Sequence, residues 1–178
     1  LQSLFKEFEF SSLLQELKIK DEGIKGQYHL ILTGNQFAAF VNRLADVKEF
    51  AFDMIVSSDV PMLADIVGLS LCISPGEVFY IPLAHDYMGM PPQLKPDDVI
   101  KDISPALASQ EIKKHGHDLK NAVIILAREK VDLKGLGCDT MVASYILNPA
   151  KHSFELADVV RDQMGRHITR PKDVIGSG

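Results

Sequence analysis

Residues 49–83 read EFAFDMIVSSDVPMLADIVGLSLCISPGEVFYIPL, and this stretch decides the fold. It contains three short runs rich in apolar, β-branched and aromatic residues, at 49–56, 65–73 and 77–83. Runs of this length and composition predict β-strands. Ser74-Pro75-Gly76 is a turn signal between the second run and the third, so these two strands are expected to form an antiparallel hairpin.

The sequence on either side of this stretch mixes extended and helical patterns. Upstream, a β-prone run at 28–32 precedes apolar residues at helical spacing across 36–47. Downstream, the patterns predict a short strand over 111–115 and helices over 96–108, 119–129, 139–147 and 153–164. Strands come first and helices dominate later, which indicates an α/β fold built on a mixed sheet with helices on its faces.

The first eighteen residues predict one or two short helices, followed by a break at 21–26. Their apolar side chains recur at helical spacings, at Leu4, Phe5, Phe8, Leu13, Leu14 and Leu17. Both ends of the sequence resemble cuts in a longer protein, because it starts with Leu1 and stops at Gly176-Ser177-Gly178. We therefore expect residues 1–26 to be leading helices or a linker from a preceding domain, and residues 27–178 to form one domain, truncated at its C-terminus.

Composition restricts the class of protein. At 178 residues the chain has the size of one domain, and 46% hydrophobic with 24% charged residues is typical of a globular core rather than of disorder. No apolar run approaches the roughly 20 residues that span a bilayer, and the start lacks the basic and apolar parts of a signal peptide. A cytoplasmic protein without a membrane partner is expected.

The net charge gives little support to general nucleic-acid binding, and the two cysteines give little support to a disulfide framework. The formal charge is −5, from 19 basic and 24 acidic residues, so no general positive field is present. Cys72 and Cys138 lack metal or redox spacing and are expected to act as small apolar residues. Two basic clusters could still meet phosphate: Lys113, Lys114, His115, His117 and Lys120, and then Arg161, Arg166, His167, Arg170 and Lys172. Nearby aspartates favour an ordinary solvated surface for both.

Asp53 stands out because it interrupts the apolar strand FAFDMI. A carboxylate there needs a hydrogen-bond partner, water or a cation, and either a strand-end cap or a metal ligand fits the sequence. Residues i and i+2 of a strand share a face, so a two-metal site would require a second carboxylate at position 55. That position is Ile55.

Other candidate motifs lack the context that their chemistry requires. His85-Asp86 and His117-Asp118 have the dipeptide of metal-dependent phosphohydrolases, but no converging set of further ligands is evident. No G-x-S-x-G elbow is present, and Gly34 and Gly68 stand alone rather than in a phosphate-binding loop. From the residues alone, the chain is an α/β domain of open activity.

Several segments, taken in order, resemble the 3′→5′ exonuclease-like domain of bacterial DNA polymerase I, a family A DNA polymerase. They cover nearly the whole chain and are LFKEFEF at 4–10, FAFD at 50–53, VGLS at 67–70, YIPLAHDY at 80–87 and DTMVASYILNP at 139–149. The resemblance implies a ribonuclease H-like mixed sheet with helices on both faces. It also implies a place between a 5′ nuclease domain and a polymerase domain of one parent chain, with roles in DNA replication and repair.

The same resemblance implies that the exonuclease motifs are degenerate. In active members an Asp and a Glu of the first motif and an Asp of the second hold two divalent metals. Here Asp53 matches the first Asp, Ile55 replaces the Glu, and the second motif aligns with Asp118-Leu119-Lys120-Asn121-Ala122, so that Ala122 replaces its Asp. The third motif is expected to lie beyond Gly178. The apolar replacements suggest a site that side chains have closed over.

Two hypotheses follow for the activity. The preferred one is a nuclease-inactive scaffold domain with a vestigial site at Asp53, Ile55 and Ala122, no cofactor of its own, Mg²⁺ only in the parent polymerase, and DNA contacted through that parent. The parent is expected to be a DNA-directed DNA polymerase, a nucleotidyltransferase. The alternative is a divergent metal-dependent exonuclease or phosphohydrolase, in which Asp53 joins relocated ligands at Asp59, Asp65 or Asp118 and His115 or His117 acts as base.

Overall fold

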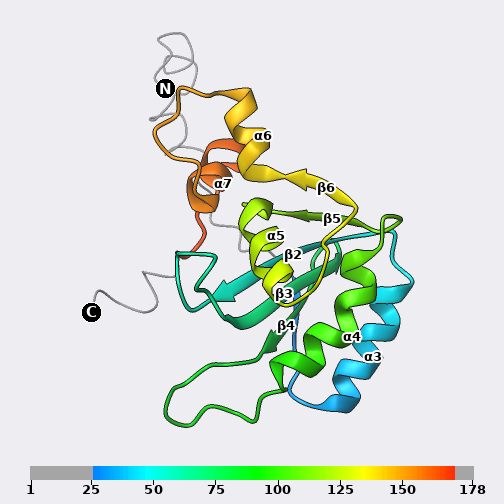
Figure 1. The fold of residues 1–178 in the computed structure, drawn as a ribbon. Coiled ribbons are helices and arrows are strands. Elements are labelled where there is room, and N and C mark those ends of the chain that lie inside the picture. Colours follow the sequence, from blue (N-terminus) through cyan, green and yellow to red (C-terminus); the bar gives the residue numbers. More distant parts are fainter. Residues whose placement is uncertain (1–25, 171–178) are drawn as a thin grey trace. The chain divides into compact units, whose positions relative to one another are not determined.

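A computed structural model describes residues 26–170 of the protein (Figure 1). The described residues fall into two compact units, 26–139 and 140–170. The leading helices predicted for residues 1–18 lie outside the described residues. None of the described helices is long and apolar enough to cross a membrane.

Residues 26–139 form a six-stranded mixed sheet with three helices. The strands are β1 (Gln27–Leu30), β2 (Glu49–Val56), β3 (Ile66–Ser74), β4 (Glu77–Pro82), β5 (Lys113–Gly116) and β6 (Leu136–Asp139). The helices are α3 (Gly34–Ala45), α4 (Pro96–Ala108) and α5 (Leu119–Arg128). The strand order is β1-β4-β3-β2-β5-β6. Strand β2 lies in the middle of the sheet. It pairs with β3 in antiparallel orientation on one side and with β5 in parallel orientation on the other.

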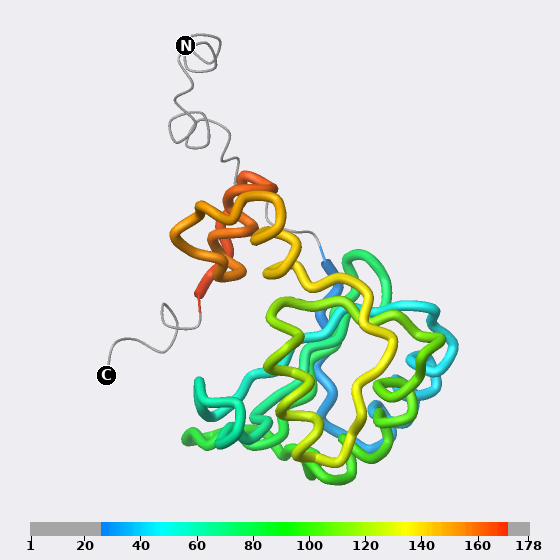
Figure 2. Tube along the Cα trace, turned by 45° about the horizontal axis from the view of Figure 1, so that its top comes forward, coloured from blue at the N-terminus to red at the C-terminus, as the bar shows by residue number. Residues whose placement is uncertain are grey.

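The structure confirms the predicted hairpin of β3 and β4, with Ser70 opposite Tyr80 and Leu71 opposite Phe79. Sequence analysis missed β6, because Leu136-Gly137-Cys138-Asp139 is short and contains glycine, which is depleted in strands. Figure 2 follows the chain out of α5, through the yellow segment that turns back beside it and into β6. This return makes β6 parallel to β5 and extends the sheet by one edge strand.

The core lies on one face of the sheet. Phe50 and Phe52 are 1% and 6% exposed, and they belong to the same buried cluster as Phe40 of α3, Ile103 of α4 and Leu126 of α5. The alternate residues of β2, including Asp53, point to the opposite face because strand side chains alternate. Thus α3, α4 and α5 share the face that carries the core.

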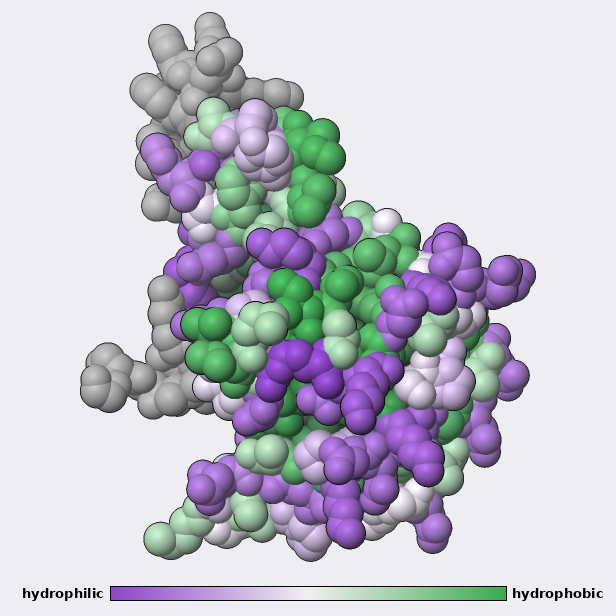
Figure 3. All heavy atoms as spheres, viewed as in Figure 1, coloured by the Kyte–Doolittle hydropathy of each residue, from purple (hydrophilic) through white to green (hydrophobic). Residues whose placement is uncertain are grey.

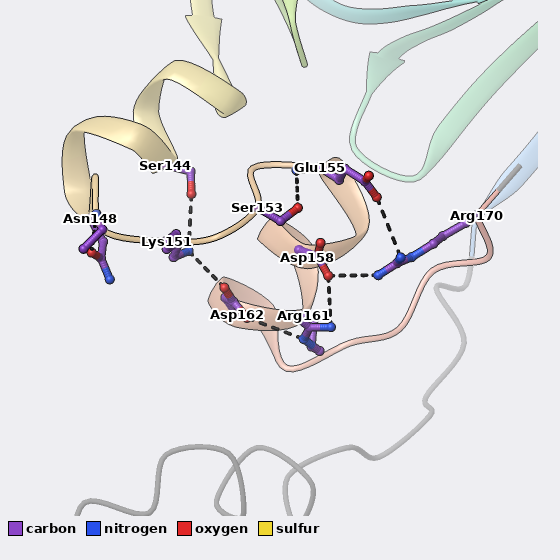
Figure 4. A network of polar contacts seen from close by, with 10 residues as sticks. Ser144, Asn148, Lys151, Ser153, Glu155, Asp158, Arg161, Asp162 and Arg170 are labelled. Carbon is purple, nitrogen blue, oxygen red and sulfur yellow. Dashed lines mark hydrogen bonds and ion pairs between the residues drawn. The ribbon is translucent and has the colours of Figure 1, made fainter. Parts of the chain in front are cut away.

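The second unit contains α6 (Thr140–Leu147) and α7 (Leu156–Met164). A network of polar contacts joins the end of α6, the following loop, α7 and the segment after α7 (Figure 4). Within it, Arg161 and Arg170 both pair with Asp158, at 3.0 and 2.9 Å. The hydrogen bond from Ser153 and the charges of the two arginines lower the pKa of Asp158 from its usual value. Burial of the carboxyl acts in the opposite direction but does not outweigh them.

Lys114 of β5 is fully buried on the core side of the sheet, opposite Phe50. Its Nζ donates hydrogen bonds to the carbonyl oxygens of Ser109 at 2.5 Å and Ile112 at 2.9 Å. Ser109 is the C-cap of α4, so the ammonium group lies at the negative end of that helix. Burial nevertheless dominates and, with a small effect of neighbouring Lys113, lowers the pKa of Lys114 to about 8.

The depressed pKa of Lys114 predicts a pH dependence of stability. Between pH about 8 and the ordinary lysine value of 10.5, the unfolded chain binds more protons than the folded chain at this residue, so its contribution to the free energy of unfolding rises with pH. The difference between wild type and Lys114→Met, measured by urea unfolding from pH 7 to 10.5, is expected to shift in favour of the wild type as pH rises. Lys113→Met, at an exposed neighbour, is the control; parallel curves for wild type and Lys114→Met would contradict the prediction.

Candidate functional site

Asp53 lies in the middle of the central strand, on the face opposite the core. Its neighbour on β3 is Ser70, which in turn pairs with Tyr80 of β4. Asp53 is exposed as a whole residue, but its carboxyl group is partly desolvated by its surroundings. This desolvation raises the pKa of Asp53. A hydrogen bond from the Met54 backbone and the charge of nearby His117 oppose this rise. Asp53 is therefore a carboxylate whose ionised form is disfavoured by its position.

Ile55 occupies the place where a second carboxylate is needed. It shares the Asp53 side of β2 and is 46% exposed, with Gly68 of β3 opposite it. Gly68 is required by close packing, because a Cβ there would meet the ring and hydroxyl of Tyr80. The expectation that side chains close over the site is wrong for Ile55, which stays open to solvent.

Ala122, the second replaced position, has the opposite environment. It lies in the first turns of α5, is 8% exposed and belongs to the buried core cluster. Here the residue packs among apolar side chains. The two positions therefore differ, since Ala122 adds to the core and Ile55 leaves an apolar side chain on the open face.

The start of α5 is held by a carboxylate from β6. The backbone N–H groups of Asp118 and Leu119 donate to the two oxygens of Asp139, at 3.1 and 2.8 Å. Asp118 itself has a left-handed backbone (φ 56°), and its Oδ2 accepts a hydrogen bond from Asn121 at 2.5 Å. Its Oδ1 is buried without a hydrogen-bond partner. Sequence reasoning missed the role of Asp139, because a cap supplied from twenty residues downstream leaves no local signal.

His85 is part of a structural arrangement in the loop after β4. Its Nε2 lies 2.5 Å from the Tyr80 hydroxyl, and its backbone N–H and carbonyl both bond to the Gln93 amide at 2.8 Å. Desolvation, with a smaller effect of Tyr87, raises the pKa of Tyr80, which keeps this hydroxyl protonated. The loop interpretation of His85-Asp86 is confirmed.

The residues present do not fit a two-metal site. Within residues 26–170, no group of three or more His, Cys, Asp or Glu side chains gathers closely enough to hold a metal ion. The alternative ligands are used elsewhere: Asp65 lies 3.7 Å from Arg128, and His115 lies 3.3 Å from Glu49. Of the histidines proposed as base, His117 is the one whose charge reaches Asp53.

Several described members of the two basic clusters are buried or paired with acidic residues. In the first, strand alternation separates buried Lys114 from exposed Lys113, and His115 faces Glu49. In the second, Arg161 and Arg170 are paired with acidic residues of α7 and the preceding loop. These contacts agree with the interpretation that the clusters are ordinary surface. Ion pairs and burial, more than aspartates interspersed in the sequence, engage these basic side chains.

Comparisons with known proteins agree with the sequence resemblance. The family model described as DNA polymerase I, ribonuclease H-like domain, matches residues 59–178. DNA polymerase I of Pseudomonas aeruginosa is 30% identical over 192 residues, covering 100% of this chain and 21% of that protein. The enzyme of the same name from Chloroflexus aurantiacus is 30% identical over 149 residues, covering 84% and 15%. The chain thus spans about a fifth or less of these curated relatives.

Two solved structures show the likeness of the fold. Trypanosoma brucei RNase D superposes with a TM-score of 0.68 at 18% identity, covering 86% of this chain and 54% of that one. The POL domain of Pol1 from M. smegmatis, in complex with DNA primer-template and dNTP, gives 0.63 at 23% identity, covering 79% and 23%. At these identities the likeness concerns the fold, and it confirms the expected ribonuclease H-like mixed α/β architecture.

The raised pKa of Asp53 predicts that its charge destabilises the fold at neutral pH. Well below the ordinary value of 3.8 the carboxyl is protonated in both folded and unfolded chains, and the penalty builds up between that value and the raised pKa of the folded chain. Asp53→Asn should therefore raise the free energy of unfolding at pH 7, with a gain that disappears towards pH 3. Urea unfolding at several pH values tests this, with exposed Asp59→Asn as control. An equal gain at pH 3 and pH 7 would be inconsistent with a charge effect.

The two hydrogen bonds of Asp139 predict a measurable capping contribution. Asp139→Ala leaves the Asp118 and Leu119 N–H groups without this acceptor and is expected to lower the free energy of unfolding by about 1 kcal/mol. Chemical denaturation gives the value, and Asp132→Ala, at an exposed loop carboxylate, is the matched control. Equal stability of the two variants would show that water replaces the cap without loss.

Proposed function

Since the chain belongs to the family of DNA polymerase I ribonuclease H-like domains, we propose that it is the nuclease-inactive 3′→5′ exonuclease-like domain of a longer DNA polymerase. In this proposal the domain serves as a structural scaffold for the polymerase domain. The parent enzyme carries out template-directed nucleotidyl transfer in replication and repair, and the domain does not cleave DNA itself.

The observation that carries this proposal is the environment of Asp53. A single carboxylate cannot offset the dehydration and mutual repulsion of two hard cations, which require several charged oxygens. The next residue on the same side of β2 is Ile55, and Ala122 of α5 is packed in the core. The pKa of Asp53 is raised rather than lowered, so its environment also disfavours the ionised form that binds metal.

The scaffold role is supported by what the fold keeps. The apolar face of the sheet retains a continuous core under α3, α4 and α5, although the opposite face lacks the ligand set. The proposed partners are the polymerase and 5′ nuclease domains of the same parent chain. DNA is contacted through that parent, and Mg²⁺ is required for its polymerase activity and not by this domain. The proposed location is the cytoplasm.

The alternative, a divergent metal-dependent nuclease, draws support from Asp118, the first residue of the segment aligned with the second motif, whose Oδ1 is buried without a hydrogen-bond partner. One carboxylate oxygen is not a ligand set. Asp118 also bonds to Asn121, and within the described part of the chain no cluster joins it to Asp53. The geometry therefore favours the inactive domain.

A degradation assay tests the proposal. A 5′-labelled single-stranded oligonucleotide is incubated with the protein and Mg²⁺ or Mn²⁺, alongside Asp53→Ala. We expect no shortening above the level of the variant, either for this chain or for the full-length polymerase compared with its own Asp53→Ala variant, because the site cannot hold the two metals. Asp53-dependent shortening of the oligonucleotide in either protein would establish the alternative.

A companion measurement gives the negative result a positive control. Ile55→Glu adds a second carboxylate on the Asp53 side of β2, and Mn²⁺ binding is followed by electron paramagnetic resonance. This variant is expected to bind Mn²⁺ more tightly than the wild type, while Ile55→Gln, which adds no charge, is not. Circular dichroism verifies that both variants are folded. Tight Mn²⁺ binding by the wild type itself would contradict the inactive-site proposal.

A further inference from the structure

Six large apolar side chains are exposed on two loops that leave the same end of the sheet. One loop, residues 57–65, joins β2 to β3, and the other, residues 84–93, follows β4. Strands β2 and β4 both run antiparallel to β3, so their carboxyl ends flank the start of β3. These apolar tips are Val60, Met62, Leu63, Tyr87, Met88 and Met90. Their exposed fractions run from 43% at Met90 to 101% at Met88, and Figure 3 shows green surface at the outer end of each loop.

The loop between β2 and β3 is held at its base and along its length. The Ser57 N–H donates to the Asp65 carbonyl at 3.0 Å, and the Asp65 N–H donates to the Ser57 hydroxyl at 2.9 Å. Arg128 of α5 donates to the carbonyl oxygen of Pro61 at 3.2 Å and to that of Ala64. Ala64 itself is fully buried. The apolar side chains of this loop are therefore presented to solvent by a fixed backbone.

The loop after β4 is fixed by the side chain of Gln93. Its amide oxygen accepts the His85 N–H and its amide nitrogen donates to the His85 carbonyl, both at 2.8 Å, which joins the two ends of the loop. Within the loop the Met90 N–H donates to the Tyr87 carbonyl at 3.2 Å. Gly89 has a left-handed backbone (φ 82°), a conformation that glycine adopts without strain. A closed turn therefore forms the tip of this loop as well.

Exposed apolar side chains on fixed loops are typical of a protein interface. Large apolar side chains gain free energy when they leave water, and a backbone that is already ordered loses little entropy when a partner binds. Three of the six apolar tips are methionines, whose flexible thioether side chains adapt to the shape of a partner surface. A partner for this end of the sheet should therefore offer apolar pockets.

The charges around the apolar tips indicate the kind of partner. Residues 57–65 and 84–93 contain three aspartates and no lysine or arginine. Asp59 and Asp86 are exposed, and the side chain of Asp65 is 77% exposed although Arg128 lies 3.7 Å from it. Acidic side chains around the tips repel phosphate, which disfavours a nucleic acid as the partner. They also oppose contact between two copies through this surface, because like charges would face each other.

A polymerase domain has the complementary charge. A domain that holds a DNA primer and template neutralises their phosphates with lysine and arginine, and therefore has basic surface. This chain covers 21% and 15% of the two DNA polymerases I compared above, so the proposed parent contains further domains that these loops can contact.

We infer that the apolar tips dock on an apolar surface of the polymerase domain of the same parent chain, with basic side chains of that domain facing Asp59 and Asp86. This inference rests on the proposed function, because it requires the parent polymerase. It assigns the scaffold role to the two loops at the carboxyl ends of β2 and β4, while the core of the domain holds these loops in place.

Oxidation of the exposed methionines tests the docking. Hydrogen peroxide converts an accessible methionine to its sulfoxide. Mass spectrometry gives the oxidation rates of Met62 and Met88 in the 178-residue chain and in the full-length polymerase, with free methionine as the rate standard. Docking is expected to slow both rates at least about threefold in the full-length protein, because burial withholds the thioether from peroxide. Asp59→Lys with Asp86→Lys should return both rates to those of the 178-residue chain.

The matched control makes the same change of charge at the other end of the sheet. Asp46 and Glu111 are exposed and lie just before β2 and β5. These two strands are parallel, so both residues are at the amino ends of the strands, away from the two loops. Asp46→Lys with Glu111→Lys should leave the oxidation of Met62 and Met88 slow in the full-length protein.

Several outcomes would overturn the docking. Equal oxidation rates in the 178-residue chain and the full-length polymerase would show that the tips stay open to water. Protection that survives Asp59→Lys with Asp86→Lys would reject a partner with basic side chains. Protection that requires added primer-template DNA would assign the tips to nucleic acid, and protection of the 178-residue chain that grows with its concentration would assign them to a second copy.

Primer extension by the full-length protein tests the proposed parent separately. Unprotected methionines in a protein that extends primers would reject the docking surface and leave the proposed function standing. Absence of primer extension would instead reject the parent polymerase, and the docking with it.

Discussion

The alternation of side chains along β2 is the constraint on which the rest of the structure depends. This strand is central, with β3 on one side and β5 on the other, and successive residues point to opposite faces. Phe50 and Phe52 enter the core, while Asp53 and Ile55 stand on the other face. Chemistry and folding are thus assigned to different faces of one strand, so a carboxylate can be lost at position 55 without disturbing any core contact. This separation would let a ribonuclease H-like fold persist without a ligand set on the other face.

Helix α5 shows the same separation in a different way. Its start is fixed by Asp139, whose two oxygens accept the first free N–H groups, and its inner side packs on the sheet. Ala122 lies on that inner side, where an apolar residue adds to the packing and a carboxylate would need a partner. Ala122 therefore adds to the stability of the domain, whereas Ile55 lies outside the core cluster.

Much of this arrangement could be predicted from the sequence, because the strands and helices carry strong periodic patterns. The run FAFDMI predicted a strand, which is central in the sheet, and a carboxylate that interrupts its apolar residues. The turn Ser74-Pro75-Gly76 predicted the hairpin. Strand β6 was missed because four residues with a glycine carry no periodic signal, and the Asp139 cap was missed because its partners are distant in sequence. The buried position of Lys114 was also not predicted from the cluster of basic residues, because only the alternation of side chains along the strand separates it from its basic neighbours.

The charges of the described surface bear on how such a domain could serve a polymerase. Lys114 points inward and bonds to carbonyl oxygens, His115 faces Glu49, and Arg161 and Arg170 converge on Asp158. A basic side chain that already holds a carboxylate must break that pair before it can bind a phosphate, and its net gain is correspondingly small. Together with a formal charge of −5, this pairing weakens the positive field on which non-specific DNA binding rests. The scaffold role proposed above depends on the core of the domain rather than on the residues around Asp53.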